Sequence, residues 1–190
     1  MKLGLFGGSF DPVHLGHLLV AQAAMEEIGL DKLFFIPAAV SPFKPENKMA
    51  AAELRLRLLR LALAGKMNCE VDDQEIRRGG ISWSIETLRD YAKKFPGAKL
   101  FYLIGADNIS KLNDWRAAEE LAKLAEFVAI PRPGESAAEF PKPFRGKILK
   151  GFPIEISSSQ IRERIKNGLP LENLMSPFVA EAIRAEKLYV

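Results

Sequence analysis

The sequence predicts an α/β protein with a Rossmann-like parallel sheet, helices on both faces and a small helical subdomain at the C-terminal end. Short apolar runs typical of buried strands alternate along the chain with longer segments of helical periodicity. Such alternation indicates parallel strands joined by right-handed crossovers. In addition, residues suited to ligand binding follow directly after several of these runs, at the edge where parallel sheets bind their ligands.

Length and composition fit a single domain over residues 1–190, with the helical part at about residues 156–190. A chain of 190 residues with 48% hydrophobic and 27% charged residues is long enough to bury a core and ordinary for a globular protein. The net charge of +3 comes from Lys and Arg spread along the chain, without a basic patch. We therefore expect no nucleic-acid partner.

The composition also indicates the cellular compartment of the protein. The one cysteine, Cys69, allows no intrachain disulfide and fits a reducing compartment. A leader-peptide pattern is lacking, and no apolar run approaches the roughly 18–20 residues of a spanning helix. These features predict a cytoplasmic protein without membrane contact. They leave the oligomeric state open, with a homodimer as one option.

The first elements are set by apolar runs and their stop signals. Lys2–Phe6 is expected to be a buried strand. Leu15–Ile28 is apolar on nearly every side, which predicts a helix buried against the sheet, and Gly29 is a suitable helix end. Lys32–Ile36 is the next strand, ended by Pro37, and a proline-rich loop follows over residues 38–49.

The middle of the chain repeats this pattern. Ala50–Ala64 is predicted to be helical because Leu54, Leu58 and Leu61 fall on one face. Asn68–Asp72 is a candidate third strand.

The next helix and strand are the clearest pair in the sequence. Ser84 is a candidate N-cap for a helix, whose apolar face is formed by Ile85, Leu88, Ala92 and Phe95. The strand Lys99–Ile104 follows and runs into Gly105-Ala106-Asp107.

The last third is expected to hold a helix over Asp114–Ala125 and a strand over Glu126–Ile130. A loop rich in proline and glycine, Pro131–Pro143, separates them from a final strand near Lys147–Leu149. Ser157 and Gln160 then have the spacing of a capping box at the start of a further helix.

Both histidines of the chain lie behind the glycine pair Gly7-Gly8, which follows the first strand. His14 and His17 are three residues apart, so on a helix they project from the same side of the first turn. A helix start has free N–H groups and the positive end of a dipole, which suits an anion. Two imidazoles at that point favour a phosphate chain as the ligand.

Other interpretations of the histidines are weaker. One of them could only cap the helix or fill a polar gap. A zinc site would need further His or Cys ligands, which the sequence does not supply. Serine hydrolase chemistry would need a G-x-S-x-G elbow, and none occurs.

The stretch GGSFDPVHLGH, Gly7 to His17, resembles the nucleotidyltransferase signature G-x-F-D-P-x-H-x-G-H. Within that superfamily the chain resembles bacterial nicotinate-mononucleotide adenylyltransferases over essentially its full length. The later motifs that support the resemblance are SPFK (41–44), SWSIETL (82–88), IGADN (104–108), Trp115, RPG (132–134) and ISSSQIR (156–162). It implies transfer of AMP from ATP to nicotinate mononucleotide, which forms deamido-NAD and pyrophosphate in NAD biosynthesis.

The resemblance also implies roles for individual residues. The catalytic residues would be His14, His17 and Lys44. The residues that would bind ATP are Gly8, Ser9, Phe10, His17, Gly105, Asp107, Arg132, Ser158 and Arg162. Those that would bind nicotinate mononucleotide are Lys44, Trp83, Ser84 and Trp115. Mg²⁺ is expected as a cofactor held mainly by the ATP phosphates, with no protein metal ligand assigned.

Several of these residues have a second interpretation. Lys44 could simply be solvated on its loop, and Asp107 could be a turn residue or an N-cap. Arg132 could have no specific purpose in its Pro-Gly loop, and Ser157 to Gln160 could be a plain helix start. Trp115 could pack in the core, because it precedes Ala118 by three residues on the apolar side of the expected helix.

Two alternative functions stay open at this point. A related nucleotidyltransferase could use nicotinamide mononucleotide or pantetheine phosphate as the acceptor, although Trp115 and the SWS segment argue against the latter. A non-catalytic nucleotide-binding or RNA-binding module would need a basic stripe with interleaved aromatic residues, which the sequence lacks.

Overall fold

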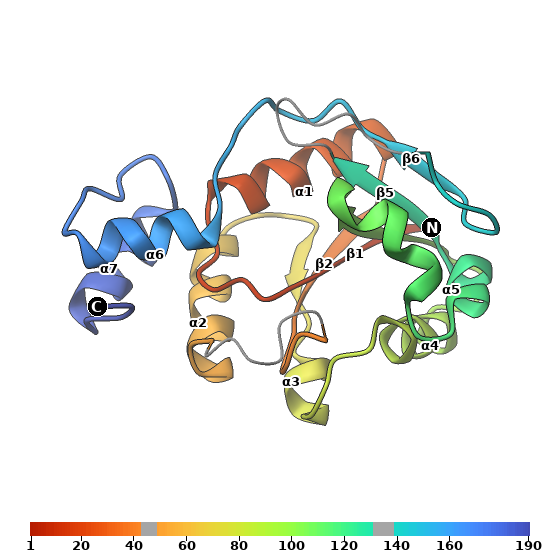
Figure 1. Cartoon of the computed structure of the whole chain (residues 1–190), viewed down its shortest axis with the longest axis horizontal. Coiled ribbons are helices and arrows are strands. Elements are labelled where there is room, and N and C mark those ends of the chain that lie inside the picture. The colour runs from red at the N-terminus through yellow and green to blue at the C-terminus, as the bar shows by residue number, and fades with distance from the viewer. Residues whose placement is uncertain (43–48, 131–138) are drawn as a thin grey trace.

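A computed structural model describes residues 1–42, 49–130 and 139–190. Its centre is a six-stranded sheet with the strand order β3-β2-β1-β4-β5-β6, and every neighbouring pair is parallel (Figure 1). The strands are β1 (Lys2–Gly8), β2 (Lys32–Pro37), β3 (Cys69–Val71), β4 (Lys99–Gly105), β5 (Glu126–Ile130) and β6 (Gly146–Ile148). The helices are α1 (Leu15–Ile28), α2 (Ala52–Leu63), α3 (Gln74–Arg78), α4 (Ser84–Lys94), the 3₁₀ helix η1 (Ala106–Asp114), α5 (Ala118–Leu124), α6 (Ser158–Lys166) and α7 (Pro177–Ala185). The predicted Rossmann-like parallel sheet is confirmed.

Alternate residues of the inner strands β1, β2, β4 and β5 face opposite layers of helices. In β2, Leu33 and Phe35 join one apolar cluster, with side chains of α1, α2, α6 and α7. Phe34 and Ile36 join a second cluster, with side chains of α4, η1 and α5. The sheet is therefore buried on both faces, as the apolar strand sequences predict.

The C-terminal helices α6 and α7 lie beside α2, at one end of the molecule (Figure 1). Ile161 of α6 and Val179 of α7 are fully buried in the cluster that also contains α1 and α2. The segment that leads to α6 crosses over α1, where the carboxylate of Glu27 accepts hydrogen bonds from the main-chain N–H groups of Lys150 (3.0 Å) and Gly151 (2.9 Å). These contacts hold the segment before α6 against α1.

Local signals in the sequence predict several boundaries correctly. Helix α1 covers Leu15–Ile28 and ends at Gly29, which has a left-handed φ of 67°. The predicted strand at Glu126–Ile130 is also observed. At the start of α6, Ser157 and Gln160 form the predicted capping box, in which Ser157 Oγ accepts from the Gln160 N–H at 3.2 Å.

Ser84 is not the N-cap of α4, so that prediction is wrong. The N-cap position belongs to Trp83, and Ser84 is the first helical residue. The Ser84 hydroxyl instead forms a 2.9 Å hydrogen bond with the hydroxyl of Tyr102 on β4. The Ser84 hydroxyl is thus bonded to Tyr102, so it does not cap the helix.

The predicted helix over Asp114–Ala125 is also wrong in its first part. The residues up to Asp114 belong to η1, Trp115 is extended (φ −72°, ψ 144°), and α5 begins only at Ala118. The indole of Trp115 meets the rings of Tyr102 and Phe127 edge-on, each at 6.2 Å between centroids. This aromatic packing outweighs the helical propensity of the segment.

Other strands and helices differ from the prediction by smaller amounts. Strand β1 continues through the glycine pair, the last strand lies one residue earlier than predicted, and the five-residue α3 was not predicted because it is too short for a periodic signal. Helix α2 buries Leu58 fully, but Leu54 and Leu61 only partly, because its buried face is centred on Arg55 and Leu59. Within the described residues, no helix is both long and apolar enough to cross a membrane.

Candidate functional site

The neighbouring strands β1 and β4 mark the point where the strand order reverses. From β1 the chain continues into α1 on one face, and from β4 it continues into η1 and α5 on the other face. Parallel sheets bind ligands beyond the carboxyl ends of such strands. Two adjoining pockets open there, and their linings share Ser9, Ile104 and Gly105.

The glycine pair Gly7-Gly8 makes room for aromatic side chains at the end of β1. A Cβ on Gly7 would lie 2.6 Å from the Tyr102 hydroxyl, and one on Gly8 would lie 3.1 Å from the Phe10 ring. Both glycines are still part of the strand, and the left-handed turn falls at Phe10, with a φ of 47°. The prediction that the glycine pair follows the first strand is therefore wrong.

His14 and His17 lie against each other at the start of α1, as their spacing predicts. His14 is the N-cap residue, and the two ring centroids are 3.8 Å apart. Gly16 between them leaves room for this packing, because a Cβ there would lie 3.0 Å from the His14 ring and 3.4 Å from the Ile156 carbonyl oxygen. The glycine inside H-L-G-H thus indicates that the two histidine rings are closely packed. Sequence reasoning did not use this signal.

The hydrogen bonding defines the tautomer of His17. Its Nδ1 accepts the main-chain N–H of His14 at 3.2 Å, so the neutral ring has its proton on Nε2. Burial, and secondly the neighbouring His14, hold the pKa of His17 well below its ordinary value. His17 is therefore a neutral donor near pH 7, and Nε2–H is the group it can offer to a ligand.

The start of α6 is attached directly to the loop that precedes the histidines. Ser158 Oγ donates to the carbonyl oxygen of Pro12 at 3.0 Å, and Arg162 Nη1 donates to that of Asp11 at 2.7 Å. The Arg162 Nη1 also lies 3.8 Å from the Asp11 carboxylate. These contacts join residues about 150 positions apart, and they bring the serine and arginine of ISSSQIR to the histidine pair.

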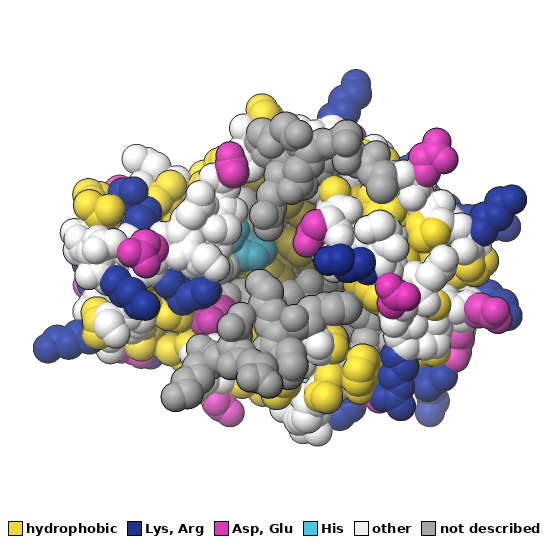
Figure 2. Space-filling model, viewed as in Figure 1, with side chains coloured by type: hydrophobic (Ala, Val, Ile, Leu, Met, Phe, Trp, Pro, Cys, Tyr) yellow, Lys and Arg dark blue, Asp and Glu magenta, His cyan; other side chains and the backbone are white. Residues whose placement is uncertain are grey.

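The larger pocket is the space between α1, the segment before α6 and the end of β4. It encloses about 590 Å³. Figure 2 shows a histidine at the bottom of this hollow, near the middle of the face in view. The residues of the predicted ATP site that line it are Ser9, Phe10, His17, Gly105, Ser158 and Arg162, together with His14.

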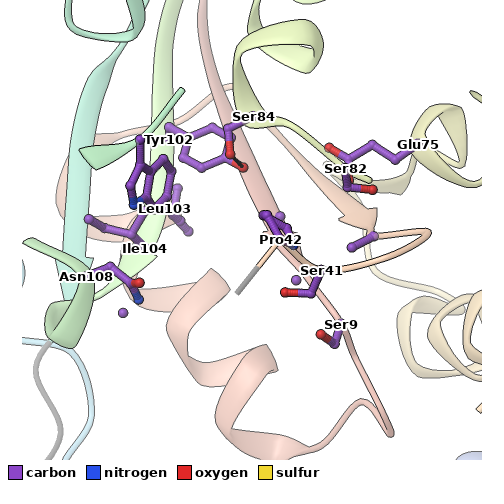
Figure 3. A pocket seen from close by; sticks show the side chains of 15 residues that line it. Ser9, Ser41, Pro42, Glu75, Ser82, Ser84, Tyr102, Leu103, Ile104 and Asn108 are labelled. Carbon is purple, nitrogen blue, oxygen red and sulfur yellow. Dashed lines mark hydrogen bonds between the residues drawn. The ribbon is translucent and has the colours of Figure 1, made fainter. Parts of the chain in front are cut away.

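The smaller pocket lies between β1, β4 and the segment that leads into α4 (Figure 3). Ser82, Ser84 and Tyr102 line it with a buried carboxyl group, that of Glu75, which accepts a 2.5 Å hydrogen bond from Thr87 Oγ1. Burial raises the pKa of Glu75, and it also raises that of Tyr102 above its ordinary value. Sequence reasoning did not identify Glu75, because a single glutamate on a short helix has no distinguishing pattern.

The two tryptophans lie near the smaller pocket, one on its lining and one in a pocket next to it. Trp115 is half-buried and lines it directly, and Trp83, Ser84 and Trp115 together line an adjacent pocket of about 230 Å³. The guanidinium of Arg116 lies over the Trp83 ring, 5.2 Å from its centroid. One edge of Trp115 therefore packs on Phe127, while the residue also borders the pocket, and its role toward the acceptor stays a prediction.

The remaining predicted residues lie elsewhere. Gly8 lines the smaller pocket. Asp107 is exposed on the first turn of η1, accepts a hydrogen bond from Asn108 Nδ2 at 3.2 Å, and falls outside both linings among the described residues. A Cβ on Gly105 would lie 2.5 Å from Asp107 Oδ1, so this glycine leaves room for the carboxylate. Lys44 and Arg132 lie outside the described residues.

Arg55 is a further residue that sequence reasoning missed. Its side chain is buried, and its guanidinium donates to the carbonyl oxygens of Ser9 (2.7 Å), Ala38 (2.8 Å) and Ala50 (2.9 Å). It thereby links the loops that follow β1 and β2. The signal was available, because position 55 shares the helical face of Leu58 and Leu59, where a charged residue needs a specific reason.

Within residues 1–42, 49–130 and 139–190, no group of three or more His, Cys, Asp or Glu could hold a metal ion. The donor set near the pockets thus lacks the ligands of a metal centre built by the protein alone.

Comparison with known proteins adds to this geometry. Residues 5–164 match the model of the cytidylyltransferase-like family. A curated protein of Opitutus terrae, named probable nicotinate-nucleotide adenylyltransferase, is 39% identical over 100% of this chain and 98% of its own length. A protein of the same name from Shouchella clausii is 38% identical over 99% of this chain and 96% of its own.

Solved structures agree on the fold. A Plasmodium falciparum nicotinic acid mononucleotide adenylyltransferase complexed with NaAD has a TM-score of 0.83 at 17% identity, over 99% of this chain and 97% of that one. A putative nicotinate-nucleotide adenylyltransferase from Vibrio parahaemolyticus has a TM-score of 0.74 at 22% identity, over 100% and 96%.

Proposed function

Because this chain belongs to the nicotinate-nucleotide adenylyltransferases of the cytidylyltransferase-like family, we propose that it transfers AMP from ATP to nicotinate mononucleotide. The products are deamido-NAD and pyrophosphate. The observation that best supports this reaction is that two pockets of different character meet at Ser9, Ile104 and Gly105, beside the histidine pair. A two-substrate transfer needs such a meeting point.

In this proposal ATP occupies the larger pocket. The helix start at His14, with its N–H groups and positive dipole end, faces an anion from one side. Ser158 and Arg162 supply donors and a positive charge from the start of α6. The neutral His17, with its proton on Nε2, donates to the α-phosphate, where negative charge develops.

The acceptor nucleotide occupies the smaller pocket, with its phosphate toward the shared residues. Its pyridine ring would lie against Trp115, and its carboxylate would accept from N–H groups in the first turn of α4, near Trp83 and Ser84. The buried carboxyl group of Glu75 also lines this pocket. Burial raises its pKa and so favours the neutral form, which does not repel the carboxylate of the acceptor.

No protein nucleophile is required. An oxygen of the acceptor phosphate attacks the α-phosphorus of ATP in line, the new P–O bond forms, and the bond to the bridging oxygen of pyrophosphate breaks. Alignment of two bound substrates contributes about 7–11 kcal/mol to such a reaction. Each preorganised donor to the developing charge contributes roughly 3–4 kcal/mol more.

We propose Mg²⁺ as the cofactor. Since the described residues offer no three-ligand set, they do not fit a metal centre held by the protein alone, and the ion would arrive on the triphosphate.

Pyrophosphate release with ATP, Mg²⁺ and a panel of acceptors tests the proposal. We expect release with nicotinate mononucleotide and much slower release with nicotinamide mononucleotide or pantetheine phosphate, with ATP alone as the blank. Faster turnover with either alternative acceptor would reassign the substrate, and release without any acceptor would indicate hydrolysis instead.

A further inference from the structure

The last turn of the chain returns to the loop that precedes the histidines. The hydroxyl of Tyr189 donates to Oδ1 of Asp11 at 2.9 Å, across 178 residues of sequence. The segment after α7 is held in place by an ion pair between Glu186 and Arg57 of α2, and by a 3.0 Å main-chain hydrogen bond from Leu188 to Ile183. In Figure 1 this end of the chain lies beside α6 and α2.

Asp11 is a junction between three separate segments. Its side chain is 7% exposed. Besides the Tyr189 hydroxyl, Oδ1 accepts the main-chain N–H of Ala50 at 3.2 Å, and Oδ2 lies 3.8 Å from Nη1 of Arg162. A buried carboxylate is costly unless such donors surround it, so each donor helps to define where the Asp11 side chain lies.

The same loop is fixed at its other end by Arg55. The Arg55 guanidinium donates to the carbonyl oxygen of Ser9, two residues before Asp11, and to that of Ala50, whose N–H bonds to the Asp11 carboxylate. Burial, and secondly the charge of Asp11, raise the pKa of Tyr189 above its ordinary value, which keeps its hydroxyl protonated as a donor. Tyr189 therefore completes a polar cluster at Asp11, on the loop that runs from Ser9 to His14.

We propose that Tyr189 is a positioning residue for adenylyl transfer, which acts through Asp11. By holding the Asp11 carboxylate, it sets the loop from Ser9 to His14 and the guanidinium of Arg162, which bonds to that loop. This inference rests on the proposed function, in which His14 and Arg162 face the triphosphate. It predicts an effect on ATP binding and turnover and none on acceptor binding.

Tyr189→Phe removes only the hydroxyl and keeps the packed ring. We expect kcat to fall about tenfold, the size of effect that follows from one hydrogen bond lost to a buried charge, with the Kd of nicotinate mononucleotide unchanged. Tyr91→Phe is the matched control, because the Tyr91 hydroxyl donates to Asp72 at 2.7 Å, in the cluster on the opposite face of the sheet. A purely structural role would give the two variants the same profile, and that result would overturn the proposal.

The imidazole ¹⁵N spectrum gives a readout that does not depend on activity. The chain has two histidines, so the signals of His14 and His17 are the only ones expected. Tyr189→Phe should shift the His14 signals, and Tyr91→Phe should not. Unchanged His14 signals in Tyr189→Phe would overturn the proposal even if kcat fell.

A double-mutant cycle tests whether Tyr189 acts through Asp11. In an Asp11→Asn background, Tyr189→Phe should have little further effect on kcat, whereas fully additive losses would contradict the mechanism. Asp11→Asn alone should lower kcat and shift the His14 signals, which keeps the test decisive if Tyr189→Phe does not fold. Lack of pyrophosphate release by the wild type would refute the proposed function, and the imidazole spectra would still decide the role of Tyr189.

Discussion

The main-chain N–H of His14 donates to Nδ1 of His17, and the two imidazole rings lie 3.8 Å apart at the start of α1. This one hydrogen bond orients the second ring and assigns its proton to Nε2. It turns a pair of residues with ordinary spacing into a rigid donor group at a helix N-terminus.

The first prediction concerns His17 as a donor in the transition state. His17→Ala should lower kcat by on the order of 10²–10³ with the fold retained, because a donor to the developing charge is lost. His17→Gln reaches the Nε2 position and should recover part of the rate, whereas His17→Asn reaches only the Nδ1 position and should not. Near-normal kcat in a folded His17→Ala protein would refute the assignment.

A second prediction separates the two nucleotide sites. Ser158→Ala combined with Arg162→Ala should weaken ATP binding at least tenfold and leave the acceptor affinity nearly unchanged, since both side chains line only the larger pocket. Arg164→Ala is the matched control on the same helix, because its guanidinium donates to the Pro170 carbonyl oxygen. Titration calorimetry with each nucleotide is the measurement. If the acceptor affinity fell instead, the assignment of the two nucleotides to the two pockets would have to be reversed.

The third prediction is discrimination between the acid and the amide. Loss of two hydrogen bonds to a carboxylate, at roughly 1.5–3 kcal/mol each, should lower kcat/KM for nicotinamide mononucleotide by about 10²–10⁴. Trp115→Ala should raise the KM of the acid acceptor, and Trp115→Phe should restore much of it if the ring stacks. Equal efficiencies on both mononucleotides would remove the selectivity claim, and an unchanged KM in folded Trp115→Ala would leave that residue a packing role only.

Gly16→Ala is the fourth prediction. Alanine favours a helix over glycine by up to about 1 kcal/mol, so a neutral site would gain stability. The added Cβ would instead lie 3.0 Å from the His14 ring and push it out of line. We expect a Tm close to that of the wild type with a clear loss of kcat. Wild-type kcat would show that the ring position tolerates the methyl group.

The fifth prediction is a pH dependence from Glu75. Its pKa is raised in the folded state by burial, so the folded protein holds a proton that the unfolded chain has released. The contribution of this group to stability is therefore full below its unfolded pKa and is lost as pH rises through the folded pKa. Glu75→Gln should weaken that fall in a series of thermal unfolding curves upward from pH 4.5. Parallel profiles of Tm against pH for the wild type and Glu75→Gln would show that Glu75 does not contribute to the pH dependence of stability.

Local sequence signals determined the order of strands and helices and the core of the nucleotide motif. The buried strand at Lys99–Ile104 and the helix Leu15–Ile28 could be predicted because apolar periodicity and the stop at Gly29 act over a few residues. The histidine spacing is local for the same reason, since the pitch of one helical turn places both rings on one side.

The tertiary structure alone decided which distant residues complete the site. Trp115 leaves its expected helix because rings from β4 and β5 hold it edge-on. Asp11 gains its donors from Tyr189 and Arg162, which follow it by 178 and 151 residues. No local pattern encodes such contacts, because a buried carboxylate selects partners by their position in space, and that position depends on how the whole sheet and its helices pack.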